Sequence, residues 1–139
     1  MCLMFGAFDI SASALSAQRV RIDTISSNIA NVDATFGKVS ADGSVAPYRR
    51  LFTVFQPQRM TDGGAGVGVK SIEEDSSPFI QKFEPGNKLA DAQGYVKYPN
   101  VDLFVEQANA LEATRAYEAN VTAIETTKSM MSATLRVLG

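Results

Sequence analysis

The stretch FDISASALSAQRVRIDTISSNIAN, residues 8–31, decides the fold of this chain of 139 residues. Apolar side chains recur in it at intervals of seven, at Phe8, Leu15, Ile22 and Ile29, and Ile25 fills the intermediate position of the same stripe. Seven-residue apolar spacing is typical of helices that pack lengthwise against other helices. The sequence therefore predicts a long N-terminal helix with one face reserved for a partner.

A second stripe with the same spacing occupies the other end of the chain. Its members are Leu103, Ala110, Tyr117, Ile124, Met131 and Leu138, flanked by Val121 and Leu135. As α-helices, residues 101–138 would be about 57 Å long and the N-terminal stretch about 42 Å. Helices in a domain of this size normally have about three turns. Helices this long are expected to pair with each other or with other copies.

The residues between the stripes are rich in turn formers and in β-branched and aromatic side chains. Residues 48–55 alternate bulky and polar side chains, which predicts a strand with Leu51, Thr53 and Phe55 on one face. Further strands are expected near residues 67–72, 79–83 and 95–98. We therefore predict an α+β fold, in which an antiparallel, coiled-coil-like pair of terminal helices carries a small β-rich insertion. The expected division is 1–32 and 101–139 for the assembly helices and 33–100 for the β-rich middle segment.

Polar residues mark the expected helix ends. Asn31 is a stop signal, because asparagine tolerates the left-handed conformation that ends helices. Asn100 is expected to cap the C-terminal helix, with Asp102 and Glu106 near the positive end of its dipole.

Composition excludes several classes of function. A net charge of −2 and a pI near 5.1 give no reason to expect nucleic acid or an anionic membrane as partner. The chain has no histidine, the commonest general base and zinc ligand, and its single cysteine, Cys2, cannot form a disulfide within the chain. We expect no catalytic, cofactor or metal site, no small-molecule substrate, no cleaved signal peptide and no transmembrane segment.

Two local patterns resemble catalytic or binding motifs. Residues 63–71, GGAGVGVKS, nearly form a phosphate-binding loop, but Val69 is inserted before Lys70 and a strand, not a helix, is expected to follow. A hairpin turn is the better interpretation, with glycines 63, 64, 66 and 68 supplying positive φ or close backbone approach. The acidic run 73–75 and the pair Arg49 and Arg50 are interpreted as solvated strand surface rather than as glycosidase carboxylates or phosphate contacts.

The candidate functional residues are therefore those of an assembly interface. They are Phe8, Leu15, Ile22, Ile25, Asn28, Ile29, Asn31, Tyr117, Asn120, Val121, Ile124, Met131 and Leu135. The three asparagines are candidates for buried amide hydrogen bonds that fix the register. Two alternatives remain open, namely capping for Asn31 and solvent exposure for Asn120.

The ordered set of motifs resembles the flagellar basal-body rod proteins, most closely those of the proximal rod, over nearly the whole chain. The motifs are FDI (8–10), SNIAN (27–31), PYR (47–49), the run from Asp75 to Pro78, EPGN (84–87), ADAQGYV (90–96), PNV (99–101) and RAYEANV (115–121), followed by Lys128, Met130, Met131 and Leu135. The SNIAN run looks like the asparagine signature shared across rod and hook proteins, and the ordered set is more specific than this run alone.

The resemblance implies a structural subunit that polymerises helically through its terminal helices and transmits torque for motility. It also implies export by the flagellar type III apparatus to the periplasmic rod, without a cleaved signal peptide. The implied partners are other copies, other rod subunits, basal-body components near the MS ring and the export apparatus. Two alternatives are a soluble helical adaptor or secretion chaperone that forms a closed oligomer, and a peptidoglycan enzyme, for which no paired carboxylates are found.

Overall fold

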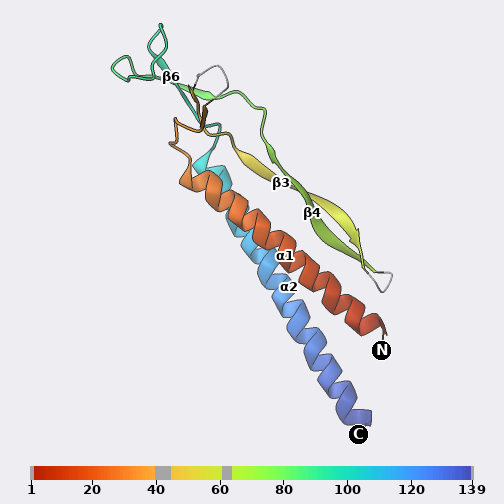
Figure 1. Cartoon of the computed structure of the whole chain (residues 1–139). Helices are drawn as coiled ribbons and strands as arrows, with labels where there is room; N and C mark the ends of the chain where they lie inside the picture. The colour runs from red at the N-terminus through yellow and green to blue at the C-terminus, as the bar shows by residue number, and fades with distance from the viewer. Residues whose placement is uncertain (1, 40–44, 61–63, 139) are drawn as a thin grey trace.

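A computed structural model describes residues 2–39, 45–60 and 64–138 (Figure 1). The elements in chain order are α1 (Cys2–Ala30), β1 (Lys38–Val39), β2 (Val45–Ala46), β3 (Leu51–Arg59), β4 (Ala65–Glu74), β5 (Ile80–Phe83), β6 (Tyr95–Tyr98) and α2 (Leu103–Leu138). Two long helices at the ends of the chain thus enclose a segment of short antiparallel hairpins. The predicted α+β architecture is confirmed.

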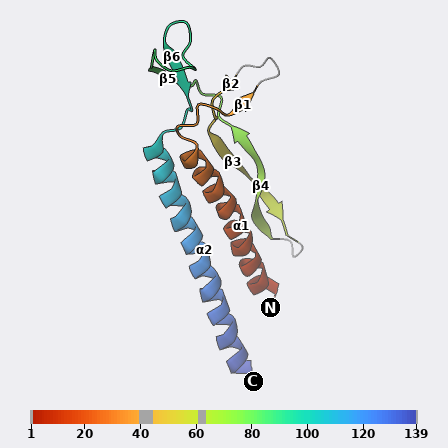
Figure 2. The same cartoon turned by 60° about the vertical axis from the view of Figure 1, so that its left-hand side comes forward.

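The two helices run antiparallel and side by side (Figures 1 and 2). Their register is marked by Arg21, whose side chain pairs with Glu112 at 3.1 Å, and by Asn28, which bonds Glu106 at 2.9 Å. With 36 residues against 29, α2 is the longer helix. Figure 1 shows its C-terminal end projecting beyond the start of α1, so the last turns of α2 lie past the end of their partner.

The described residues form three two-stranded antiparallel sheets, of which β3 and β4 make the longest hairpin. This hairpin lies along the side of α1 that faces away from α2 (Figure 2). Val54 pairs with Ser71 and Phe55 with Val69, so Lys70 is an extra residue that forms a bulge. Leu51 and Thr53 are half-buried but Phe55 is 38% exposed, so the face predicted to carry all three is covered only before the bulge.

The glycine-rich stretch folds differently from the expected turn. Gly66 and Gly68 lie inside β4, and neither has positive φ; Gly63 lies outside the described residues. Gly66 is instead required by close approach, because an added Cβ would lie 2.6 Å from the Ser13 hydroxyl of α1 and would also meet the Met60 methyl group. The expected hairpin is confirmed, but β4 begins at Ala65, within the stretch that was predicted to be turn.

Local hydrogen bonds mark the two helix ends that meet the middle segment, namely the start of α2 and the end of α1. The N-cap of α2 is Asp102, whose carboxylate accepts the backbone N–H of Phe104 at 2.9 Å, and not Asn100 as predicted. At the other boundary α1 ends at Ala30, and Asn31 donates its side-chain amide to the Ser27 carbonyl at 2.8 Å. Asn31 thus follows the helix end as predicted, although no non-glycine residue among those described has positive φ.

Candidate functional site

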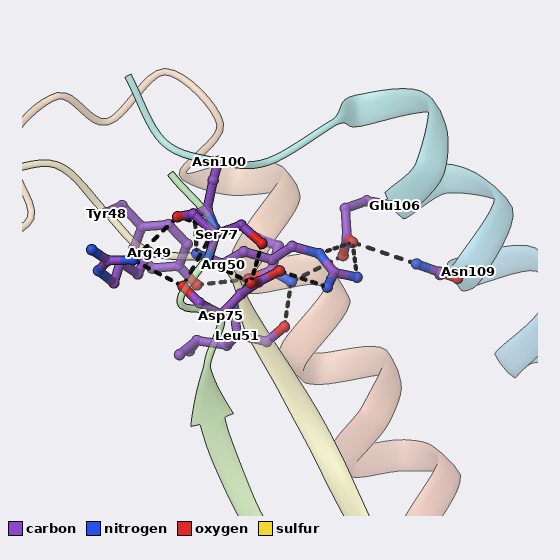
Figure 3. A network of polar contacts seen from close by, with 10 residues as sticks. Tyr48, Arg49, Arg50, Leu51, Asp75, Ser77, Asn100, Glu106 and Asn109 are labelled. Atoms are coloured by element: carbon purple, nitrogen blue, oxygen red, sulfur yellow. Dashed lines mark hydrogen bonds and ion pairs between the residues drawn. The ribbon is translucent and has the colours of Figure 1, made fainter. Parts of the chain in front are cut away.

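One buried cluster of polar groups joins both terminal helices to the hairpin (Figure 3). We call Asn28, Tyr48, Arg50, Leu51 and Glu106 the polar junction. Asn28 and Glu106 have no solvent-exposed surface, and they are among the largest fully buried side chains of the described chain. Because buried polar groups are costly unless paired, the geometry of this cluster determines whether the helices can meet here at all.

The carboxamide of Asn28 is fully hydrogen-bonded. Its Nδ2 donates to the Leu51 carbonyl at 2.7 Å and to Glu106 Oε2 at 2.9 Å. Its Oδ1 accepts the Leu51 backbone N–H at 2.9 Å and the Tyr48 hydroxyl at 3.0 Å. Four hydrogen bonds satisfy the donor and acceptor capacity of the amide.

The pairing pattern of the hairpin explains why Leu51 meets a side chain. The backbone N–H of Asp75 bonds the Arg50 carbonyl at 2.8 Å, so Arg50 faces β4 and the next residue, Leu51, turns its N–H and C=O outward. Asn28 binds both of these outward groups, as a residue of a third strand would do. The amide therefore fastens the open edge of β3 to α1.

A buried ion pair completes the junction on the α2 side. The Glu106 carboxylate oxygen Oε1 accepts from Arg50 Nε and also lies 2.8 Å from Arg50 Nη2. Glu106 has no exposed surface, whereas the Arg50 side chain is 25% exposed and also contacts the Asp75 carboxylate at 3.5 Å. The charge of Glu106 is thus compensated within the subunit, by Arg50 and by the Asn28 amide.

The residues around Asp75 form the outer rim of this cluster. The Asp75 carboxylate accepts the Ser77 hydroxyl at 2.6 Å and the Ser77 backbone N–H at 2.9 Å. These two bonds, followed by the Arg50 guanidinium, hold the pKa of Asp75 below its ordinary value of 3.8. The Asn100 side-chain oxygen accepts the Arg50 backbone N–H at 3.0 Å. Asn100 therefore contributes to this cluster and does not cap α2.

The basic pair and the acidic run are therefore not simply solvated surface, as the sequence suggested. Arg50 and Asp75 belong to the polar cluster, and the Arg49 guanidinium lies 4.3 Å from the centre of the Phe79 ring. Glu73 and Glu74 are exposed, in agreement with the prediction. The error arose because alternation along one strand gives no information on what the other elements bring against it.

The predicted assembly residues occupy three kinds of position. Ile25 and Asn28 are buried, whereas Phe8 and Leu135 are 39% and 66% exposed. The half-buried members are Leu15, Ile22, Ile29, Asn31, Tyr117, Asn120, Val121, Ile124 and Met131. The two helices contact one another, and the role of these residues in assembly between subunits remains a prediction.

The three asparagines have different roles. Only Asn28 links separate elements, because Asn31 bonds the Ser27 carbonyl and Asn120 bonds the Ala116 carbonyl of its own helix at 2.8 Å. Asn120 is half-buried rather than freely exposed. A register-fixing amide is therefore found at one of the three predicted sites.

Sequence reasoning missed Arg50, Tyr48 and Glu106 as members of the site. A signal for Glu106 was present, since it lies one heptad before Ala113, which has no exposed surface, and two heptads before Asn120. A carboxylate in a helix seam predicts a buried cationic partner. Nothing in the sequence indicated which arginine would supply it.

Among the described residues, no group of three or more potential metal-binding side chains is found. Neither of the two described helices is long and apolar enough to cross a membrane. From Ala65 onward the phosphate-loop pattern lies in β4, with Lys70 at the bulge, and not before a helix. Such a strand cannot direct successive backbone N–H groups at one phosphate.

Comparison with known proteins gives matches at both helices and over the full length. A family described as "Flagella basal body rod protein" matches residues 8–37, and "Flagellar basal body rod FlgEFG protein C-terminal" matches residues 92–137. The chain is 42% identical over 146 residues to the flagellar basal-body rod protein FlgC of Bacillus subtilis, with 96% of this chain and 97% of that protein covered. It is 45% identical over 136 residues to FlgC of Salmonella typhimurium (95% and 96% covered) and 39% identical over 153 residues to FlgC of Borreliella burgdorferi (97% of each).

Proposed function

Since this chain belongs to the flagellar basal-body rod proteins, and is a structural subunit of the bacterial proximal rod, we propose that it polymerises helically through its two terminal helices. One observation carries this proposal. The apolar seam between α1 and α2 continues along α2 past the start of α1, where Leu135 is 66% exposed. A seam that extends past its own partner needs a partner from another subunit.

The polymer is proposed to be an open helix rather than a ring. Contacts between two different faces of identical subunits repeat indefinitely when the rotation does not close, and a shaft needs such contacts. Torque is then transmitted through lateral helix packing, while the polar junction holds the hairpin in a fixed position on the helices. This division assigns residues 1–32 and 101–139 to assembly and 33–100 to the outer part of the subunit.

The partners follow from the location in the basal body. The chain assembles with other copies and other rod subunits, and it meets basal-body components near the MS ring. It reaches the periplasmic rod through the flagellar type III export apparatus. Its role is structural rather than enzymatic, and the family of its relatives does not favour the alternative of an adaptor or chaperone with a closed oligomer.

A pair of charge substitutions tests the proposal. Leu135→Asp should leave the free energy of unfolding of the purified subunit within about 0.5 kcal/mol of wild type, because this side chain is mostly exposed. It should nevertheless abolish swimming and the recovery of complete rods in isolated basal bodies. Normal rods and swimming with Leu135→Asp, at wild-type protein levels, would contradict assembly through the end of α2.

Ile25→Asp is the matched control within the same seam. Ile25 is only 6% exposed, so a carboxylate there would lack a buried partner and should destabilise the isolated subunit by several kcal/mol. Both variants are expected to be non-motile, but only Ile25→Asp should lower the melting temperature. The comparison separates loss of assembly from loss of folding.

A further inference from the structure

The side of α2 that faces away from α1 carries an exposed stripe that lies outside the heptad positions. Its members, spaced alternately by four and three residues, are Phe104, Ala108, Leu111, Arg115 and Glu118. Phe104 is 82% exposed and Leu111 is 55% exposed, whereas Glu106 and Ala113 on the opposite side are completely buried. Two large apolar side chains and two charges thus lie together on one solvent-facing helix surface. We call these five residues the outer face of α2.

Helix α1 has an exposed stripe of matching periodicity. Its members are Ser16, Arg19, Asp23, Ser26 and Ala30, spaced alternately by three and four residues, and all are exposed. The buried residues Ala17 and Ile25 lie on other sides of the helix, against α2 and the hairpin. We call the five exposed residues the outer face of α1. Its small side chains leave room for larger ones from a neighbouring helix.

The charges on the two outer faces form no ion pair with the parts of the subunit that the structure describes. Among the described residues, no ion pair engages Arg19 or Asp23 on α1, or Arg115 or Glu118 on α2. The half-buried Arg21 and the exposed Glu112, by contrast, pair with each other at 3.1 Å. Two oppositely charged residues on each outer face are therefore available to a second molecule.

We propose that the outer face of α2 in one copy packs antiparallel against the outer face of α1 in a second copy. This inference rests on the proposed function and specifies the lateral contact of the polymer. When the faces are aligned so that Arg115 lies opposite Asp23, Glu118 lies opposite Arg19. The same alignment places Leu111 opposite Ser26. One register thus satisfies both charge pairs and seats an exposed leucine on a small residue.

The apolar end of the interface agrees with this register. Ala108 lies opposite Ala30, so the helix backbones can approach closely where neither face carries a bulky side chain. Phe104 then extends past the end of α1 toward the segment that follows Ala30. A contact with two charge pairs at one end and apolar side chains at the other has a single favoured orientation.

The proposed register differs from the one inside the subunit. Within the subunit Glu112 lies opposite Arg21, which would place Arg115 near residue 18. Between subunits Arg115 lies opposite Asp23, a displacement of about five residues, and Glu118 is displaced by about four. This is slightly more than one helical turn, or about 6–7.5 Å along the axis. Neighbouring copies are therefore staggered, and a staggered contact between unlike faces builds an open helix.

Charge reversal with rescue tests the pairing. Asp23→Arg alone and Arg115→Asp alone should each reduce swimming to the level of a strain without rods, because each places like charges opposite one another. The double variant Asp23→Arg/Arg115→Asp should restore swimming and rods. Lys88→Glu, an exposed reversal in a loop, should have no effect. Failure of the double variant to restore either property would overturn the proposed pairing.

Cross-linking distinguishes failure of this interface from failure of the proposed function. Ala30→Cys/Ala108→Cys in a Cys2→Ser background should give a ladder of disulfide-linked oligomers in isolated basal bodies, since the two positions face away from each other within one subunit. Ser16→Cys/Ala108→Cys is the control, with cysteines on the same two faces but too far apart in this register to cross-link. Subunits present in basal bodies without a ladder would refute the interface alone, whereas absence of the subunit from basal bodies would refute the proposed function.

Discussion

At the end of the helix pair where α1 ends and α2 begins, Asn28 and Glu106 are fully buried and fully paired. At the other end, Met130 and Leu135 are 59% and 66% exposed. The polar groups of the first end find every partner within the subunit. The apolar side chains at the second end find few partners within the subunit. This difference indicates which end is completed by folding and which is completed by a neighbour.

The polar junction also explains how a chain with few buried apolar residues keeps a defined shape. The buried apolar side chains among those described are Ala17, Ile25, Pro47, Val96, Pro99, Val101 and Ala113, which are small or of medium size. Such a core is adaptable, because small side chains impose little shape complementarity. Hydrogen bonds with fixed geometry specify the arrangement of helices and hairpin instead.

Removal of Glu106 should have the largest effect on the subunit itself. Glu106→Ala leaves Arg50 and the Asn28 amide without their buried partner, which should lower the free energy of unfolding by about 3–5 kcal/mol. Glu112→Ala breaks an ion pair in which the glutamate side chain is 69% exposed, and it should cost less than about 1 kcal/mol. Urea unfolding monitored by circular dichroism measures both. Similar losses for the two variants would show that burial does not decide the strength of these pairs.

Replacement of Asn28 should come next in size. Asn28→Ala removes four hydrogen bonds and leaves the Leu51 N–H and C=O unpaired, so we expect a loss of about 2–3 kcal/mol. Hydrogen exchange at the Leu51 amide should accelerate in the same variant. Asn120→Ala, which removes one bond within a helix, should cost less than about 1 kcal/mol. Equal effects at both positions would remove the distinction between a linking and a local asparagine.

The elements of this fold could be predicted from sequence because they depend on local periodicity. The heptad stripes at Leu15, Ile22 and Tyr117 placed both helices, and alternation placed β3 and β4. The polar junction could not be predicted in this way. Asn28, Arg50 and Glu106 lie 22 and 56 residues apart in sequence, and only the antiparallel return of α2 brings them together.

Errors in the prediction arose where a residue has two plausible roles. Asn100 is a good cap by type, but Asp102 lies closer to the first helical N–H groups and has a charged acceptor. Gly66 suited a turn by composition, but its neighbours Val67 and Val69 extend the strand to Ala65. In both cases the expected element was found, but the residue assigned to the cap or to the turn was wrong.

The contact between α1 and β4 offers a smaller test of the same packing. Gly66→Ala would place a methyl group 2.6 Å from the Ser13 hydroxyl, which accepts the Val67 N–H at 3.1 Å. We expect a loss of about 1–3 kcal/mol in thermal or urea unfolding, because helix and strand must separate. The methyl group of Gly68→Ala would approach closely only the Gln58 side-chain oxygen, at 2.9 Å, which is free to move, so this variant should cost less than about 1 kcal/mol. A larger loss at Gly68 would contradict close packing as the reason for glycine in β4.

The smallest effect is expected for Asp75. Its side chain is partly exposed to solvent at the rim of the polar junction, whereas that of Glu106 is fully buried. Because hydrogen bonds from Ser77 lower the pKa of Asp75 below 3.8, its ionised form stabilises the folded state at all pH values above 3.8. This contribution is lost as pH falls through the lower pKa of the folded state. Asp75→Asn should therefore be less stable than wild type by less than about 1 kcal/mol at pH 7, and the difference should shrink as pH falls below 3.8. Urea unfolding of both proteins between pH 7 and pH 3 measures this difference in stability. Ser77→Ala should reduce the pH-dependent contribution of Asp75 in the same way. A stability difference that grew as pH fell would contradict the assigned sign.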